Sequence, residues 1–222
     1  MDRLYHLWLS PFSRKVRIAM AEKKLEFETC IEKVWERRDD FLSLNPAGKV
    51  PVLVISGGPV LVDSWAITEY LEEVHPEPSL LGRDPISRAE TRRLVAWFDE
   101  KFNAEVTDLL VYEKIMKRLL SLGEPNSASI RAGNTNIHTH LDYIGWLTED
   151  RRWLAGDEFS LGDIAAAAHL SCVDYLGDIP WEEHSRAKDW YARVKSRPSF
   201  REILGDHIPG YPPPKHYADL DF

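Results

Sequence analysis

The sequence places two hydroxyl groups at the expected start of a helix, directly after an apolar run of strand length. That run, residues 4–9, ends at Ser10-Pro11, where Ser is a favourable N-cap and Pro suits the first helical turn. A hydroxyl at the positive end of a helix dipole can donate a hydrogen bond to an anion such as a thiolate. Ser10 is therefore a candidate for activating a thiol, and Ser13, one turn further on, is the second candidate. Ser10 could equally serve only as the cap of its helix.

Two further segments carry groups that could bind a polar ligand. Residues 45–53 read NPAGKVPVL, so Pro51 stands directly before an apolar run of strand length. Because proline cannot donate a hydrogen bond to a neighbouring strand, its position there needs a reason. Asp63 and Ser64 precede a second helical pattern, and the free N–H groups at such a helix start can hold a carboxylate. Both segments are candidate binding elements.

The elements that must position these groups alternate between strand and helix in the first third of the chain. The turn sequence SGGP at residues 56–59 predicts a hairpin. The expected order is β-α-β followed by β-β-α, with a parallel first pair joined by a right-handed crossover. The expected strands cover residues 4–9, 25–34, 50–55 and 60–62, helices follow Ser10 and Ser64, and a short helix or loop covers 36–43.

After the prolines at residues 76, 78 and 85, the strand pattern gives way to helical patterns. Ser160 and Asp163 form a capping box at the start of one of these helices, so we assign both residues a structural role. The predicted organisation is an α/β domain of residues 1–78, a linker of residues 79–86, an all-helical domain of residues 87–205 and a Pro-rich tail of residues 206–222.

The composition excludes several classes of protein. The chain has 28 basic and 36 acidic side chains, a net charge of −8, without the basic face that a nucleic-acid binder carries. Only two cysteines occur, and no apolar run approaches the ~18 residues of a membrane span, which favours a cytoplasmic protein. His138 and His140 are two apart on a predicted helix and point to different sides, so we expect no metal site.

In this order and spacing, four motifs resemble those of the glutathione transferase superfamily, and the resemblance covers nearly residues 3–205. They are residues 10–17 followed by Glu22-Lys23, the loop NPAGKVPVL at 45–53, the segment DSWAITEYL at 63–71, and the capping motif FSLGDI at 159–164. The resemblance implies a thioredoxin-like α/β domain followed by an all-α domain. It also implies a homodimer that uses glutathione as co-substrate, and no metal.

The resemblance assigns roles to the binding segments. In members of the superfamily, the peptide bond before the proline that corresponds to Pro51 is cis. This geometry would leave the backbone of Val50 free to pair with the cysteinyl part of glutathione. Ser64 would hold the γ-glutamyl carboxylate and Asp63 the ammonium, although many relatives have the longer Glu at the latter position. Lys49, and also Arg14, could meet the other end of the tripeptide, with a solvated charge as the simpler interpretation.

The implied activity is attack of the glutathione thiolate on a small hydrophobic electrophile, with the thiol ionised by Ser10 or Ser13. The electrophile would lie against the helical domain. Phe102 and Tyr112, in the first long helices of that domain, could line its pocket, although aromatic residues at such positions also suit a helical core.

A second interpretation keeps the fold without the catalysis. Some members of the superfamily are binding modules, among them FzlA-like proteins, which bind the bacterial division protein FtsZ. Four of the 14 prolines fall within residues 209–214, and the tail ends in alternating acidic and apolar residues, a pattern that suits docking into a partner. The tail could instead pack on its own helical domain, and Trp35, which lies in a polar segment, could cover the core. The candidate interaction residues are Trp35, Tyr217, Leu220 and Phe222.

Overall fold

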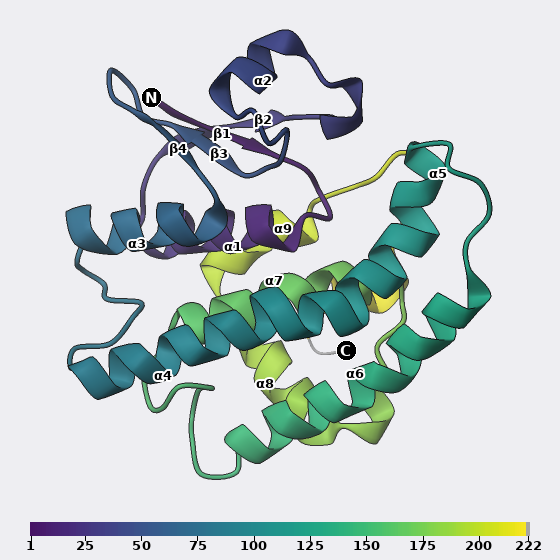
Figure 1. The fold of residues 1–222 in the computed structure, drawn as a ribbon. Helices are drawn as coiled ribbons and strands as arrows, with labels where there is room; N and C mark the ends of the chain where they lie inside the picture. The colour runs from purple at the N-terminus through teal and green to yellow at the C-terminus, as the bar shows by residue number, and fades with distance from the viewer. Residues whose placement is uncertain (221–222) are drawn as a thin grey trace. The chain divides into compact units, whose positions relative to one another are not determined.

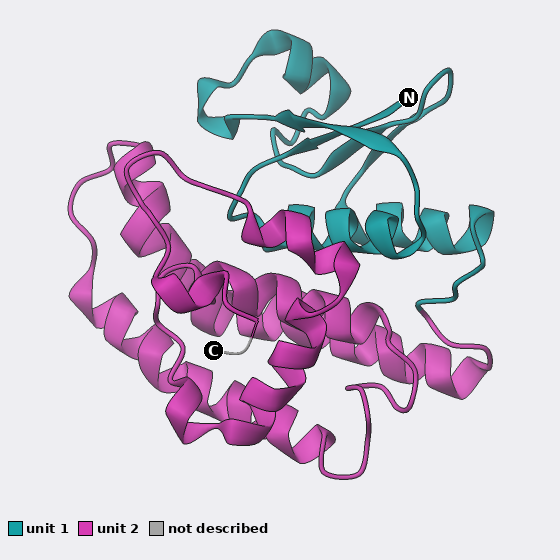
Figure 2. Ribbon diagram, turned by 180° about the vertical axis from the view of Figure 1, so that it is seen from behind, with its two compact units in different colours: residues 1–80 teal, residues 81–222 magenta. Residues whose placement is uncertain are grey.

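The first of two units, residues 1–80, is built on a four-stranded sheet in the order β2-β1-β3-β4 (Figures 1 and 2). β1 (Asp2–His6) pairs in parallel with β2 (Phe27–Ile31) and antiparallel with β3 (Val52–Val54), which forms a hairpin with β4 (Val60–Val62). This is the predicted thioredoxin-like order. The computed structural model describes residues 1–220.

Three helices complete the first unit. α1 (Pro11–Glu22) connects β1 to β2, α2 (Asp39–Leu44) precedes β3, and α3 (Ser64–Val74) follows β4. α1 and α3 pack against one another on one face of the sheet (Figure 1). They enclose a core in which full burial of each aliphatic side chain contributes roughly 1.5–3 kcal/mol. That core consists of Leu4, Val16, Met20, Leu53, Ile67 and Leu71.

β1 is shorter than the apolar run that predicts it. The strand ends at His6 rather than at residue 9, because the Ser10 amide donates to the Leu7 carbonyl at 3.1 Å and closes a turn. Leu7 and Leu9 remain buried, so their apolar character reflects packing of the turn and not strand pairing. The turn sets the point at which α1 begins.

The second unit, residues 81–222, is helical over its described part. α7 (Leu161–Asp174) is buried along its whole length. Its small residues permit close approach, and a Cβ added at Gly162 would lie 3.1 Å from Cβ of Leu94. A helix that is apolar all round belongs inside a bundle. α7 packs against α4 (Pro85–Ala96), against the π-helical segment Trp97–Met116 that continues α4, and against α8 (Ser185–Lys195). α5 (Lys117–Leu119) and α6 (Ser127–Leu147) pack on the π-helical segment, and α9 (Arg201–Leu204) follows α8 in the chain.

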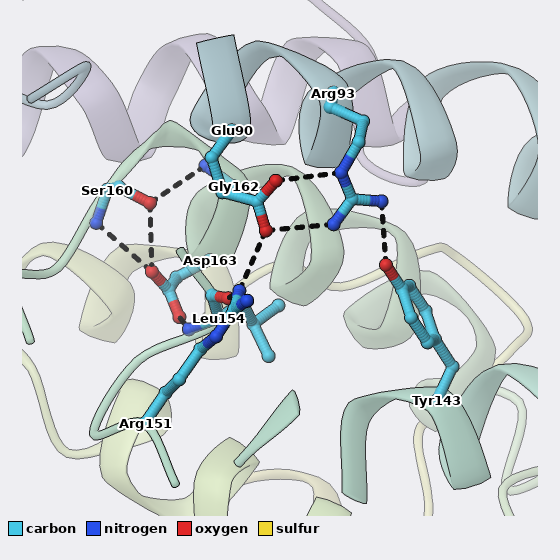
Figure 3. Close-up of polar contacts among 8 residues, drawn as sticks. All are labelled: Glu90, Arg93, Tyr143, Arg151, Leu154, Ser160, Gly162 and Asp163. Atoms are coloured by element: carbon cyan, nitrogen blue, oxygen red, sulfur yellow. Dashed lines mark hydrogen bonds and ion pairs between the residues drawn. The ribbon is translucent and has the colours of Figure 1, made fainter. Parts of the chain in front are cut away.

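The predicted capping box starts α7. The Ser160 hydroxyl accepts the amide of Gly162 at 3.2 Å, and the fully buried Asp163 carboxylate accepts the Ser160 amide and hydroxyl, each at 3.1 Å (Figure 3). Asp163 also accepts the Leu154 amide and the indole N–H of Trp190, both at 2.9 Å. Burial raises the pKa of Asp163, and these donors offset part of that cost.

An ion-pair network lies beside the box. Arg93 donates to both carboxylate oxygens of Glu90 at 2.8 and 2.9 Å, and Arg151 reaches the same carboxylate at 2.7 Å (Figure 3). The Arg93 hydrogen bonds are the main reason that the pKa of Glu90 falls to about 2. The network ties α4 to Arg151 and, through Arg93 and Tyr143, to α6.

Within residues 1–220 there is no helix whose length and apolarity would let it cross a membrane. In the same residues, no three side chains of the metal-binding types His, Cys, Asp and Glu are grouped to hold an ion.

Candidate functional site

The strand registers bring three of the predicted segments to one edge of the sheet. Tyr5, near the end of β1, pairs with Val52 at the start of β3, and Val52 pairs with Val62 at the end of β4. The turn that leads to Ser10, the loop that ends at Pro51, and the start of α3 at Asp63 therefore leave the sheet at the same edge.

Ser10 stands at the N-terminus of α1. Its hydroxyl oxygen accepts the amide of Ser13 at 3.2 Å, so it caps the helix. The hydroxyl proton remains available to a further acceptor. Ser10 is half-buried, and an anion beside it would also meet the positive end of the α1 dipole. Capping and thiolate stabilisation are therefore compatible at this residue.

Ser13 is fully buried, and its hydroxyl has no hydrogen-bond partner within residues 1–220. A buried hydroxyl without a partner costs about 1–3 kcal/mol. Because no part of Ser13 is exposed, Ser10 is the only one of the two serines with surface that a ligand could contact.

Arg14 braces the turn before Ser10. It is fully buried, and its Nε donates to the Trp8 carbonyl at 2.6 Å. Its position corrects the expectation of a solvated charge or a ligand contact. A buried cation that holds a loop carbonyl was not visible in the sequence, because its acceptor is a backbone group.

The loop before β3 is held by a residue that the sequence analysis did not single out. Asn45 is buried, its Nδ2 donates to the Lys49 carbonyl at 2.8 Å, and its Oδ1 accepts the Ala47 amide at 3.1 Å. The Val50–Pro51 peptide bond is cis, as the resemblance implied. The Lys49 side chain is exposed, which suits a contact with a ligand or with water.

Asp63 and Ser64 start α3 in an unusual backbone conformation. The backbone of Asp63 has φ +74°. This conformation costs a non-glycine residue about 1–3 kcal/mol, and residues that adopt it are concentrated at functional sites. Its Oδ1 accepts the Trp65 amide at 2.8 Å and so caps the helix, while Ser64 is buried at 4% exposure. Together the three segments offer a hydroxyl, two helix N-termini and a cis-proline loop, an arrangement suited to an extended anionic ligand.

In the helical unit, the two candidate pocket residues have different environments. Phe102 is fully buried, with its ring 4.9 Å from that of His140 and 5.8 Å from those of Phe98 and His169. It is a core residue of this unit, which corrects its proposed place in an electrophile pocket. Tyr112 is 39% exposed and could contact a ligand.

Trp35 lies in a short 3-10 turn, Val34–Glu36, and is half-buried. The buried Glu32 carboxylate, on one side of this turn, accepts from Arg38 at 2.6 Å on the other side. The pair closes the segment into a loop and holds part of the indole at the surface. The alternation of Glu and Arg in EKVWERR is the signal that could have predicted this pair.

The Pro-rich tail packs on its own helical unit. Tyr217 is fully buried, donates to the Ile203 carbonyl at 3.1 Å and meets the Tyr175 ring edge-on at 5.1 Å. Burial removes Tyr217 from the residues that a partner could contact on this surface. Leu220 is exposed at 36%, and Phe222 lies outside the described residues.

Comparison with known proteins identifies the family. The chain matches the N-terminal domain of glutathione S-transferases over residues 9–74 and their C-terminal domain over residues 115–198. Its sheet order, its helical unit and the cis proline are consistent with this match. The chain belongs to the glutathione S-transferase superfamily.

Three relatives are informative. A crystal structure of a glutathione S-transferase from Rhodospirillum rubrum F11 is 60% identical, with a TM-score of 0.97 and complete coverage of both chains. FtsZ-localized protein A of Caulobacter vibrioides is 50% identical over 99% of this chain and 97% of its own, and the structure of FzlA from C. crescentus superposes with a TM-score of 0.97 over 100% and 99% of the two chains. A glutathione S-transferase from Methylobacterium radiotolerans, in complex with glutathione sulfonate, is 32% identical with a TM-score of 0.76 over 91% and 93%.

Proposed function

We propose that this chain is an FzlA-like protein that associates with FtsZ and uses the glutathione S-transferase fold as a binding scaffold. The observation that carries the proposal is the 50% identity to FtsZ-localized protein A over 99% of this chain. The family match ends at residue 198, whereas this similarity extends over the tail as well. Because a shared fold does not by itself imply a shared function, the proposal is supported by the similarity over the whole chain, which the Rhodospirillum rubrum structure also shows.

The candidates with accessible surface are Trp35, which is half-buried, and Leu220, which is exposed. Aromatic anchors that are partly exposed and rigidly held are typical centres of protein interfaces. The Glu32–Arg38 pair holds the loop of Trp35, and the buried Tyr217 holds the tail beside Leu220. Both residues are therefore presented on ordered segments.

Co-sedimentation with assembled Caulobacter vibrioides FtsZ filaments tests the proposal. We expect the wild-type chain to pellet with the filaments, Trp35→Ala to weaken that association about tenfold, and Leu220→Ala to weaken it less, because leucine is under-represented among interface hot spots. The matched controls are Trp146→Ala and Leu122→Ala, whose side chains are 62% and 57% exposed elsewhere on the chain. A wild-type chain that stays in the supernatant would refute the proposal, and equal losses in the controls would refute the choice of residues.

A second candidate function is glutathione conjugation. It is supported by the Ser10 hydroxyl at the start of α1 and by the convergence of the cis-proline loop and the α3 N-terminus at the same sheet edge. In this proposal Ser10 stabilises the thiolate, Ser64 and Asp63 hold the γ-glutamyl end, and Val50 pairs with the cysteinyl backbone. Lowering a thiol pKa by one to two units requires roughly 1.4–2.7 kcal/mol, within reach of a hydroxyl and a helix dipole.

Calorimetry with glutathione and a chloronitroarene conjugation assay test the second function. We expect Ser10→Ala to lower conjugation, while Ser13→Ala, at the enclosed hydroxyl, leaves it nearly unchanged. Absence of glutathione binding at millimolar concentration would exclude this function and leave the FtsZ proposal standing.

Homodimerisation and a cytoplasmic location also remain proposals. Light scattering coupled to size exclusion tests the first. A mass near 25.6 kDa, that of a single chain, would refute it.

A further inference from the structure

The tail forms a strap that is fixed at both ends and bridges a hollow between them. At its first end, Pro209 and Gly210, with Gly210 at φ +82°, turn the chain so that the Tyr211 amide donates to the Ile208 carbonyl at 3.0 Å. The Tyr175 hydroxyl accepts the Ile208 amide at 2.8 Å and donates to the Tyr211 carbonyl at 2.7 Å.

The second end is anchored by buried groups of the helical unit. Lys195 donates to the carbonyls of His216 and Asp219, and the His216 ring lies 3.1 Å from the Asp174 carboxylate. Between the two anchors, Pro212, Pro213 and Pro214 run without regular secondary structure, and a strap of consecutive prolines has little conformational freedom to lose when a ligand binds.

The strap forms one wall of this hollow, a groove with a cavity volume of about 570 Å³. Figure 1 shows the tail, in yellow, reaching toward the end of α5. This volume lies within the range of small-molecule and cofactor sites. The opposite walls come from the helix ending in α5 and from the end of α7, and the lining consists of Lys114, Ile115, Arg118, Tyr175, Leu176 and residues 210–214.

The charged side chains of this lining are both cations, in a chain whose net charge is −8. Lys114 is neutralised by Asp178, with its Nζ 2.6 Å from both carboxylate oxygens. Arg118 is exposed, and within residues 1–220 its guanidinium has no carboxylate partner; it lies 5.4 Å above the Tyr211 ring. The ring face attracts the cation, and the N–H groups of the guanidinium can still donate to an oxygen ligand.

We propose that this groove binds an acidic segment of a partner protein. A carboxylate of the segment accepts hydrogen bonds from Arg118, and an apolar side chain next to that carboxylate packs against the three prolines of the strap. Charge complementarity selects a carboxylate, and the length of the strap beside the cavity favours a peptide over a single small anion. This proposal rests on the proposed function in one respect only: both assume that the chain binds a partner protein.

Fluorescence anisotropy with a labelled synthetic peptide of three Asp-Leu-Glu repeats tests the groove without FtsZ. We expect saturable binding that weakens as salt rises, and no binding of the matching Asn-Leu-Gln peptide. Arg118→Glu should weaken binding about tenfold or more, and Arg118→Lys should fall between, because it keeps the charge and loses the planar fork. Arg131→Glu, the same change at an exposed arginine of α6 outside the groove, should bind as the wild type does.

Three results of the peptide assay would overturn the proposal. They are equal binding of the acidic and amide peptides, unchanged binding by Arg118→Glu, and displacement by free glutamate at the same carboxylate concentration, which would indicate a small-anion site. A peptide-independent change in oligomeric state on Arg118→Glu would assign the groove to a second copy of the chain and would also overturn it. If the wild type binds the peptide but does not pellet with FtsZ, the proposed function fails and the groove stands.

Discussion

Replacing Tyr217 with alanine tests whether the tail is an integral part of the helical unit. The side chain is fully buried, its ring contacts Tyr175, and its hydroxyl donates to Ile203. Truncation of a buried aromatic side chain costs about 3–5 kcal/mol. For a chain of this length each kcal/mol shifts the melting temperature by about 2–4 °C, so we expect a decrease of roughly 6–20 °C.

Thermal unfolding followed by circular dichroism measures this shift, and two further variants separate its causes. Tyr217→Phe removes only the hydrogen bond, about 1 kcal/mol, and should lower the melting temperature by about 2–4 °C. Leu220→Ala, at an exposed position three residues on, should change stability by less than about 0.5 kcal/mol. A Tyr217→Ala protein that melts within about 2 °C of the wild type would refute the packing of the tail on its own unit.

Three further predictions concern the capping box, the ion-pair network and the two hydroxyls. Asp163→Ala removes the acceptor of several buried donors and should cost about 3–5 kcal/mol in urea unfolding, whereas a loss below 1 kcal/mol would contradict the role of the box. Because Arg93 lowers the pKa of Glu90 from 4.5 to about 2, the ionised carboxylate stabilises the fold above pH 4.5, and that contribution is lost as the pH falls toward 2. The stability difference between wild type and Glu90→Gln should therefore shrink over that window; a difference independent of pH would argue against the pair. Ser10→Ala should cost about 1 kcal/mol through loss of the cap, while Ser13→Ala, which deletes an unpartnered buried hydroxyl, should be neutral or slightly stabilising, and the reverse order would contradict the geometry.

Features that depend on neighbours in sequence were the most predictable. The capping box at Ser160 and Asp163 is confirmed because an N-cap and its N3 partner lie three residues apart. The hairpin at residues 56–59 and the start of α1 at Pro11 are likewise local. The thioredoxin-like order follows from the succession of these elements.

Burial was much harder to predict than element type. The chemistry of their side chains makes Phe102, Tyr217 and Ser13 candidates, and each is fully buried. Their environments depend on residues distant in sequence: the ring of Phe102 meets His169, and that of Tyr217 meets Tyr175. The type of a residue indicates which chemistry its side chain can perform, whereas the packing of the fold determines whether a ligand or partner can contact it.

The central claim is association with FtsZ, and the most direct measurement is the affinity of the wild-type chain for assembled FtsZ filaments, obtained by co-sedimentation over a range of filament concentrations. The proposed function predicts saturable pelleting that Trp35→Ala weakens and Trp146→Ala does not. A chain that fails to pellet at any filament concentration, while it binds glutathione and conjugates it, would contradict the claim and make glutathione transfer the function of this fold.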